Sequence, residues 1–197
     1  PAHLLGDWQF AVWDNRRRTL FIARDHCGNT GLYYYRNPRF FVFASNLKAL
    51  LALPQVPRRP NLLRVAQILT SWPGDGIQTA YEDLVRLPPA HTLRVTETAA
   101  ETYRYWYPER LSPIKLASDG DYVEEFLRIY RQAVRCRLRT HHPIGITLSG
   151  GLDSGSVAAL AAPMMAQDGK RLTAFTSVPL FDTHAGAGNK RTGDEWP

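Results

Sequence analysis

The sequence predicts two parts of different fold class: an α+β N-terminal part built on antiparallel sheets, followed by the start of an α/β part built on a parallel sheet. Two observations support this expectation. Short apolar runs separated by turn residues fill the first half of the chain, which is typical of antiparallel hairpins. The second half has the order helix, strand, Gly-rich loop, helix, strand, which is typical of a parallel sheet with right-handed crossovers.

Four short apolar runs near the N-terminus predict two hairpins. Residues 10–13 end at an Asp-Asn turn signal and residues 19–24 return, so that three consecutive arginines lie near the tip. Residues 32–35 and 40–43 flank an Asn-Pro turn and form the second hairpin. Continuous apolar runs of this kind favour strands that are buried on both faces, as in one layer of a larger sandwich.

Asparagine residues predict the starts of two helices beyond the hairpins. Asn46 precedes a helix over 47–53, and Asn61 precedes a second helix that ends near residue 71. The stretch 84–95 predicts a turn that leads into one strand, with 102–107 as its partner.

The first domain is then expected to cover residues 1–107. The polar, proline-containing stretch 108–118 is a linker, and residues 119–197 form the second domain.

A long amphipathic helix is expected at the start of the second domain. Apolar residues recur at helical spacing, Asp121 and Glu124 have the spacing of a capping box, and Pro143 prevents continuation, which together predict a helix over 121–140. Residues 144–148 then predict a short buried strand, 153–165 a helix and 172–178 a further strand. The tail over 182–197 is rich in Gly, Thr and Asn and predicts a loop.

The loop between the predicted strand 144–148 and the next helix has the chemistry of an anion site. Its sequence is Ser149-Gly150-Gly151-Leu152-Asp153-Ser154. The two glycines can adopt positive φ and approach a phosphate closely, the serines add hydroxyl donors, and a helix N-terminus favours negative charge. Asp153 can both cap the helix and face a hydrated Mg²⁺. The loop therefore predicts a site for the pyrophosphate end of ATP, with a purely structural Gly-Gly turn as the alternative.

Composition excludes several classes of function. The net charge is +6, but the basic residues are scattered, whereas a nucleic-acid footprint is a basic stripe interleaved with aromatics. No nucleic-acid partner is therefore expected. The sequence has no apolar run of about 18 residues and does not begin with a signal-peptide pattern, so we expect no membrane partner and a cytoplasmic location.

The sulfur-containing residues support two further expectations. Cys27 and Cys136 lie far apart without metal-ligand spacing, which favours packing or surface residues over a disulfide, a zinc site or a nucleophile. The methionines are Met164 and Met165, far from the first residue. We therefore expect a chain that is processed or taken from a longer protein.

The loop and several upstream motifs resemble one family in their order along the chain. Residues 149–154 resemble the pyrophosphate loop of N-type ATP pyrophosphatases, which adenylate a carboxylate and release pyrophosphate. Four segments resemble the late glutaminase domain of glutamine-hydrolysing asparagine synthetases: GDWQFAVWD (6–14), ARDHCG (23–28), LYY (32–34) and FASNLKAL (43–50). Two more, LPPAH (87–91) and RYW (104–106), resemble that family's link into its synthetase domain. The resemblance extends to about Val178.

This resemblance implies an internal fragment of a glutamine-dependent amide ligase. Its first domain would be a truncated glutaminase domain of the Ntn-hydrolase type, and its second the start of an ATP pyrophosphatase domain. In the family, glutamine hydrolysis supplies ammonia, which converts a β-aspartyl-adenylate into asparagine with release of AMP. The implied substrates are ATP, aspartate and glutamine, the implied metal is Mg²⁺, and a homodimer is left open.

The resemblance also assigns site residues by position. The residues at the pyrophosphate are Ser149, Gly150, Gly151 and Ser154. Asp153 would bind the metal, and Thr147 and Ser177 match positions whose backbone meets the adenosine. The family's cysteine nucleophile and glutamine-binding residues correspond to positions before residue 1, so no catalytic residue is assigned. We expect the 197-residue chain to be inactive alone.

Departures from the family pattern and two other functions stay open. Asn29-Thr30-Gly31 replaces the apolar residue and proline that often follow the Arg-Asp pair. The same adenylation chemistry also serves relatives that close a β-lactam or lasso-peptide ring with a substrate amine; a cysteine directly after the initiator would argue against these. A non-catalytic binding module is the third hypothesis, favoured if ATP binding does not depend on Asp153.

Overall fold

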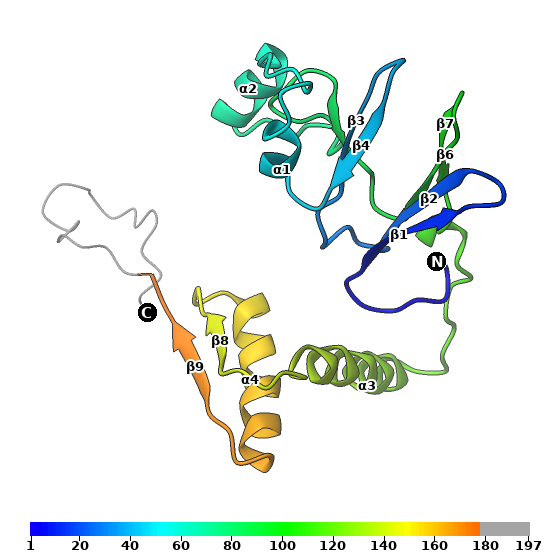
Figure 1. The fold of residues 1–197 in the computed structure, drawn as a ribbon. Coiled ribbons are helices and arrows are strands. Elements are labelled where there is room, and N and C mark those ends of the chain that lie inside the picture. Colours follow the sequence, from blue (N-terminus) through cyan, green and yellow to red (C-terminus); the bar gives the residue numbers. More distant parts are fainter. Residues whose placement is uncertain (178–197) are drawn as a thin grey trace, which may run out of the picture. The chain divides into compact units, whose positions relative to one another are not determined.

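The computed structural model describes residues 1–177, which divide between two compact units, residues 1–112 and residues from 113 onward. The predicted strand end at Val178 and the tail 182–197 lie outside the described residues. The first unit contains β1 (Gln9–Asp14), β2 (Thr19–Arg24), β3 (Tyr33–Arg36), β4 (Phe41–Ala44), α1 (Leu47–Leu51), α2 (Leu62–Leu69), β5 (Leu84–Arg86), β6 (His91–Val95) and β7 (Ala100–Arg104), followed by a 3-10 turn at Pro108–Arg110. The second contains α3 (Asp119–Arg137), β8 (Ile144–Thr147), α4 (Leu152–Gln167) and β9 (Leu172–Phe175) (Figure 1).

Two antiparallel sheets and a helix form the layers of the first unit. One sheet has the strand order β1-β2-β6-β7 and the other the order β4-β3-β5. The core between the sheets consists of Ile22, Leu32, Leu87, Leu93 and Val95, with Tyr34 and Phe41 packed against it. A second core lies between the three-stranded sheet and α1 and consists of Tyr35, Leu50, Val56 and Leu84. The predicted α+β class with antiparallel sheets is confirmed.

Consecutive tyrosines on β3 show how one strand serves both cores. Side chains alternate between the faces of a strand. Tyr34 therefore packs toward the four-stranded sheet, whereas Tyr33 and Tyr35 face α1. The prediction of burial on both faces is correct for β3 but wrong for β1, where Val12 is 54% and Trp13 is 53% exposed. β1 is an edge strand in the described part of the chain, with β2 as its neighbour.

The stretch 84–95 holds two strands rather than the predicted one. β5 pairs with β3, whereas β6 pairs with β2 in the other sheet. The two prolines between them cannot donate a ladder hydrogen bond, and Ala90 has a φ of +58°, so the chain leaves one sheet and enters the other at this point. The predicted partner of β6 is confirmed as β7, which begins at Ala100 because Thr96 N–H donates to the carbonyl of Ala99 (2.8 Å) in a tight turn.

The guanidinium of Arg24 lies inside the first unit, only 3% exposed, and binds backbone carbonyls. It donates to the carbonyls of Thr30 (2.7 Å), Leu87 (2.5 Å) and Gly28. In turn, the hydroxyl of Tyr105 donates to the carbonyl of Arg24 (2.6 Å), and burial raises the pKa of that phenol to about 12. One side chain thus fastens the turn after β2 to the turn between β5 and β6.

The neighbouring Asp25 is 1% exposed and is satisfied by the loop that follows it. Its carboxylate accepts from the backbone N–H of Asn29 (3.0 Å) and of Thr30 (3.1 Å), and from the Thr30 hydroxyl (2.7 Å). Burial by itself would raise the pKa of Asp25, but these hydrogen bonds outweigh it and lower the pKa. Thr30, one of the departures from the family pattern, therefore donates hydrogen bonds to the buried carboxylate.

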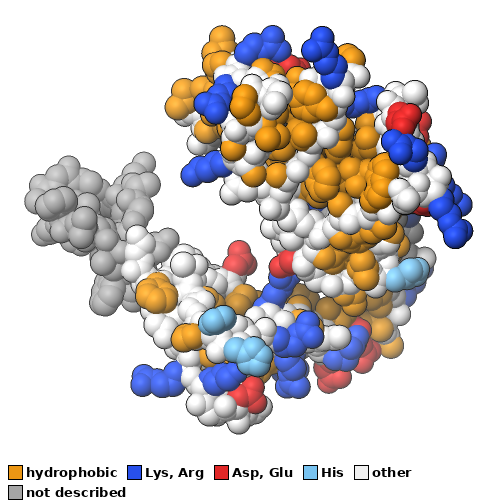
Figure 2. All heavy atoms as spheres, in the orientation of Figure 1, with side chains coloured by type: hydrophobic (Ala, Val, Ile, Leu, Met, Phe, Trp, Pro, Cys, Tyr) orange, Lys and Arg blue, Asp and Glu red, His pale blue; other side chains and the backbone are white. Residues whose placement is uncertain are grey.

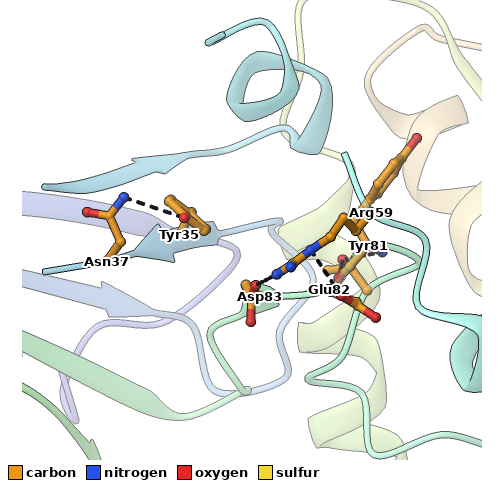
Figure 3. Close-up of polar contacts among 7 residues, drawn as sticks. Tyr35, Asn37, Arg59, Tyr81, Glu82 and Asp83 are labelled. Atoms are coloured by element: carbon orange, nitrogen blue, oxygen red, sulfur yellow. Dashed lines mark hydrogen bonds and ion pairs between the residues drawn. The ribbon is translucent and has the colours of Figure 1, made fainter. Parts of the chain in front are cut away.

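A surface cluster fixes the entry to β5. Arg59 Nη2 lies 2.7 Å from a carboxylate oxygen of Asp83, and its Nε lies 3.1 Å from one of Glu82 (Figure 3). Both pairs are exposed, so each contributes about 0–1 kcal/mol. Their effect is positional, since Asp83 adopts a φ of +63° directly before the strand.

Hydrophobic side chains also lie on the surface (Figure 2), among them Leu62, Leu69 and Trp72 on and after α2.

In the second unit, α3 begins two residues earlier than predicted. Ser118 is the N-cap, its hydroxyl accepts from the N–H of Asp121 (3.2 Å), and the Asp121 carboxylate accepts from the N–H of Ser118 (2.9 Å). The predicted capping box of Asp121 and Glu124 is wrong because this earlier pair satisfies the orphan donors first. The helix ends at Arg137, three residues before the predicted end at residue 140.

A parallel strand pair and two helices make up the described part of the second unit. β8 and β9 pair in parallel from Ile144↔Leu172 to Thr147↔Phe175, which confirms the start of an α/β part. α4 contacts both strands and α3 (Figure 1). The predicted buried strand is only half correct: Ile144 and Ile146 are half-buried, whereas Gly145 and Thr147 are exposed. The two isoleucines line an apolar pocket with α3 and α4, on one face of the pair.

Replacing Thr30 by Val should lower the free energy of unfolding by about 1–3 kcal/mol, because a buried carboxylate loses a hydroxyl donor. The lowered pKa of Asp25 means that its carboxylate stabilises the fold above the unfolded pKa of about 3.9 and that this contribution disappears as pH falls through the folded value. The variant should therefore lose less stability on acidification. Urea unfolding at neutral and acid pH measures both effects.

Thr19→Val is the matched control, since the Thr19 hydroxyl donates to the carbonyl of Arg17 (3.0 Å) at an exposed turn. Its stability should stay within about 0.5 kcal/mol of the parent chain. Equal effects of the two substitutions would contradict the role given to Thr30.

Candidate functional site

The Gly-rich loop lies where β8 ends and α4 begins. β8 ends at Thr147, and the next residue, Leu148, donates its N–H to the carbonyl of Phe175 (2.8 Å), the last residue of β9. The loop therefore starts at the carboxyl edge of both parallel strands. Ligands of open α/β sheets bind outside this edge.

The two glycines of the loop adopt different backbone conformations. Gly150 has a φ of +74°, as predicted. Gly151 does not use this freedom: it has a φ of −78° and a ψ of 160°, and is the extended N-cap residue of α4. Extended backbone at this position lets the chain enter the helix directly from the left-handed turn at Gly150.

Asp153 is inside the first turn of α4 and does not cap the helix, which corrects the predicted capping role. The N-cap is Gly151, and no side chain in the described part of the chain caps this end. The first backbone N–H groups of a helix have no intrahelical acceptor. At this loop they lie at the positive end of the helix dipole, next to the hydroxyl of Ser149, which is the arrangement that binds anions.

The hydroxyl of Ser154 forms hydrogen bonds across the loop. Its Oγ accepts from the N–H of Ser149 (3.1 Å) and donates toward the carbonyl of Gly151 (3.3 Å). The hydroxyls of Ser149 and Ser154 are also 3.1 Å apart. Ser154 is half-buried, whereas Ser149 is exposed. The structure therefore brings the two serines together and links them across the loop.

The other predicted site residues lie at the same edge of the strand pair. Thr147 is the last residue of β8 and pairs with Phe175, and both are exposed. Ser177 follows two residues after the end of β9 and is exposed. None of the hydrogen bonds between described residues links Ser177 to the loop. Its place beside the loop thus follows from the parallel pairing alone.

Sequence reasoning missed two hydroxyls that support the first turn of α4. Ser156 Oγ donates to the carbonyl of Asp153 (2.9 Å), and the hydroxyl of Tyr130 on α3 lies 2.7 Å from Ser156 Oγ. Tyr130 belongs to the apolar stripe of α3, so its pattern indicated packing alone. The polar end of a tyrosine within such a stripe was the available signal, because a tyrosine that is not fully exposed usually finds a partner for its hydroxyl.

The residues at the loop fit one way of holding Mg²⁺. Asp153 is the one carboxylate of residues 149–154. No group of three or more His, Cys, Asp or Glu side chains with metal-site geometry occurs among residues 1–177. Mg²⁺ is commonly held by one or two carboxylates together with phosphate oxygens and waters, and a single carboxylate beside an anion site suits this mode.

Other predicted features can be placed as well. Cys27 and Cys136 are both exposed and form no disulfide, in line with the expectation of surface residues. Over the described range of the chain, no helix is both long and apolar enough to cross a membrane.

Comparison with known proteins assigns the chain to a family. The family model of the glutamine amidotransferase domain matches residues 2–106, and the family model of asparagine synthase matches residues 125–195. The chain belongs to the glutamine-hydrolysing asparagine synthetase family. The Gly-rich loop lies within the asparagine synthase match, and the Arg24 and Asp25 cluster lies within the amidotransferase match.

Curated relatives of the family show how much of a full-length member this chain represents. It is 34% identical to asparagine synthetase [glutamine-hydrolyzing] 3 of Bacillus subtilis over 85% of the chain and 27% of the relative. It is 32% identical to amidase chyE of Penicillium rubens, over 94% of the chain and 29% of the relative. A putative asparagine synthetase [glutamine-hydrolyzing] 2 of Methanocaldococcus jannaschii is 29% identical over 79% of the chain and 30% of the relative. The chain thus spans somewhat more than a quarter of these proteins.

The conformations of the two glycines predict opposite responses to alanine. Gly150→Ala places a Cβ at a φ of +74° and should lower the free energy of unfolding by about 1–2 kcal/mol. Gly151→Ala has an ordinary φ, and its Cβ would lie 3.4 Å from Ser149 Oγ, so its effect should stay within about 0.5 kcal/mol. Thermal unfolding of the two variants measures the difference. A larger loss for Gly151→Ala would contradict the described loop conformation.

Proposed function

We propose that this chain is part of an ATP-dependent, glutamine-dependent amide ligase that makes asparagine from aspartate. The observation that carries the proposal is the uncapped N-terminus of α4 behind the Gly150 turn, within the asparagine synthase match. The amidotransferase match over the first unit supports glutamine as the nitrogen source. On this proposal residues 1–107 are the late glutaminase portion, 108–118 the linker and 119–197 the early synthetase portion.

The proposed role of the loop is to bind the pyrophosphate end of ATP. The N–H groups of the first turn of α4 and the exposed hydroxyl of Ser149 would donate to phosphate oxygens, with Gly150 and Gly151 allowing close approach. Ser154 would hold the loop in the conformation that binds phosphate, through its hydrogen bonds to Ser149 and Gly151. Donors that the surrounding loop holds in position need little reorganisation when an anion binds.

Asp153 would hold Mg²⁺ together with phosphate oxygens, and the metal when bound supplies charge neutralisation at the leaving pyrophosphate. Thr147 and Ser177 would line the adenosine at the carboxyl edge of β8 and β9, through their backbone. All the proposed ligands therefore come from one edge of one strand pair and the helix that follows it.

The proposed chemistry has two steps on the substrate carboxylate. A carboxylate oxygen attacks the α-phosphorus of ATP, the bond from that phosphorus to the bridging oxygen breaks, and pyrophosphate leaves. Ammonia then attacks the acyl carbon, AMP leaves, and the nitrogen releases a proton to give the amide. The loop contributes by positioning and by charge stabilisation of the leaving group. The isolated 197-residue chain is proposed to complete neither this reaction nor glutamine hydrolysis.

A second candidate is amide formation on a different carboxylate. The observation that favours it is the 32% identity, over 94% of this chain, to amidase chyE, whose name specifies no aspartate substrate. The loop would bind the nucleotide in either case, since its proposed role is confined to the phosphate end of ATP.

Asp153→Asn in the intact protein should weaken binding of Mg·ATP by about 1–3 kcal/mol, because a charged ligand is replaced by a neutral one of the same size. Isothermal titration with Mg·ATP measures this. The matched control is Asp168→Asn at the C-terminal cap of the same helix, which should leave the dissociation constant unchanged. Unaltered binding by the Asp153 variant would favour a purely structural loop.

Labelled oxygen tests the adenylation step and the substrate together. With ¹⁸O in both oxygens of the aspartate side-chain carboxylate, one labelled oxygen should appear in AMP for each asparagine formed, because the attacking oxygen stays with the phosphorus when the amide forms. Mass spectrometry of AMP from the intact protein detects it. Unlabelled AMP would rule out the acyl-adenylate, whereas turnover with another carboxylate in place of aspartate would select the second candidate.

A further inference from the structure

The hydroxyl of Tyr130 reaches the first turn of α4 from the facing helix. It lies 2.7 Å from Ser156 Oγ, and Ser156 Oγ in turn lies 2.9 Å from the carbonyl oxygen of Asp153. A serine hydroxyl has one hydrogen, and the Asp153 carbonyl can only accept. Ser156 therefore donates to Asp153, and Tyr130 donates to Ser156. The three groups form a single directed chain of hydrogen bonds that ends in the backbone of α4.

The far end of this chain is the peptide group that joins Asp153 to Ser154. Its carbonyl oxygen accepts from Ser156, and its N–H is that of Ser154, in the first turn of the helix. Hydrogen bonds in series polarise one another, so donation into this carbonyl makes the N–H on the other side of the same peptide a stronger donor. That N–H is one of the groups left without an intrahelical acceptor at the anion site.

The chain also fixes the first turn in place. α4 has no side-chain cap within the part of the molecule that the structure describes, and Ser154 and Ser156 both lie in its first two turns. Ser154 ties this turn to the loop, whereas Ser156 ties it to α3 through Tyr130. Tyr130 is half-buried, and its ring lies at a centroid distance of 5.4 Å from that of Phe126, one turn earlier on the same helix.

The geometry points to Tyr130 as a positioning residue for the pyrophosphate loop, acting through Ser156 on the Asp153–Ser154 peptide. This inference rests on the function proposed above and adds two residues, neither of which is given a direct contact with the nucleotide in that proposal. It predicts that removing the phenolic hydroxyl weakens binding of the phosphate end of ATP and leaves the fold in place.

The test compares dissociation constants of Mg·ATP and of Mg·pyrophosphate in the intact protein. Tyr130→Phe removes one hydroxyl and keeps the ring, and both constants should rise about three- to tenfold, as expected for one lost neutral hydrogen bond. Ser156→Ala should give a rise of the same size. The double variant should add nothing further, because the two hydroxyls act in one chain. Ser156→Thr retains a hydroxyl that can bond to the same carbonyl and should restore binding.

Tyr122→Phe is the matched control on the same helix. The Tyr122 hydroxyl accepts from the N–H of Leu116 (3.1 Å), and Tyr122 lies about two helical turns before Tyr130 on α3, so loss of its hydroxyl should leave both constants unchanged. A lower melting temperature of Tyr130→Phe with unchanged dissociation constants would overturn the inference, as would independent, additive effects of the two single variants. If Asp153→Asn also leaves Mg·ATP binding unchanged, the proposed function fails and the inference fails with it.

Discussion

The buried guanidinium of Arg24 is the interaction on which the first unit depends. It donates to three backbone carbonyls, of which that of Leu87 is buried, and these carbonyls belong to the turns that connect the two sheets. Gly28 has to be glycine for this to work: it has a φ of +67°, and a Cβ there would lie 2.9 Å from Arg24 Nη2 and 2.7 Å from Pro89 Cγ. A buried cation is costly unless fully hydrogen-bonded, so the turns and the arginine specify one another.

Local signals in the sequence were enough wherever one residue type decides the structure. The bounds 19–24 were predicted correctly because turn residues lie on both sides of an apolar run, and Asn46 and Asn61 do cap α1 and α2. The errors occur where two local solutions compete or where neighbours decide. Ser118 and Asp121 both offer cap spacing, and only the backbone conformation at Ser118 selects the earlier start. The exposure of β1 depends on which strands lie beside it, which no local pattern records.

The candidate site also has features that local sequence signals predict and features that depend on neighbouring elements. A strand, a Gly-rich turn and a helix predict an anion site at a sheet edge. Glycine permits the left-handed conformation seen at Gly150, but residue type alone does not distinguish it from Gly151, which is extended. The helix cap could not be read from the residues, because Asp153 is a good capping residue that the turn places two positions too late. Tyr130 and Ser156 lie on different helices, and their contact exists only once α3 packs on α4. The adenosine residues Thr147 and Ser177 stay predictions.

The pairing of β2 with β6 has a consequence for how the first unit folds. The hairpin of β1 and β2 is local and can form as soon as residues 9–24 have left the ribosome, but its inner strand needs the backbone of residues 92–95 to complete its ladder. The chain between Arg24 and His91, which forms the smaller sheet and both short helices, therefore separates β2 from β6 in the sequence. Contacts between residues this far apart in sequence slow folding, because closing the long loop between them costs conformational entropy before the contacts form. During synthesis, the open side of β2 is therefore an unpaired edge that other chains can reach, and the late arrival of β6 is the step that removes it.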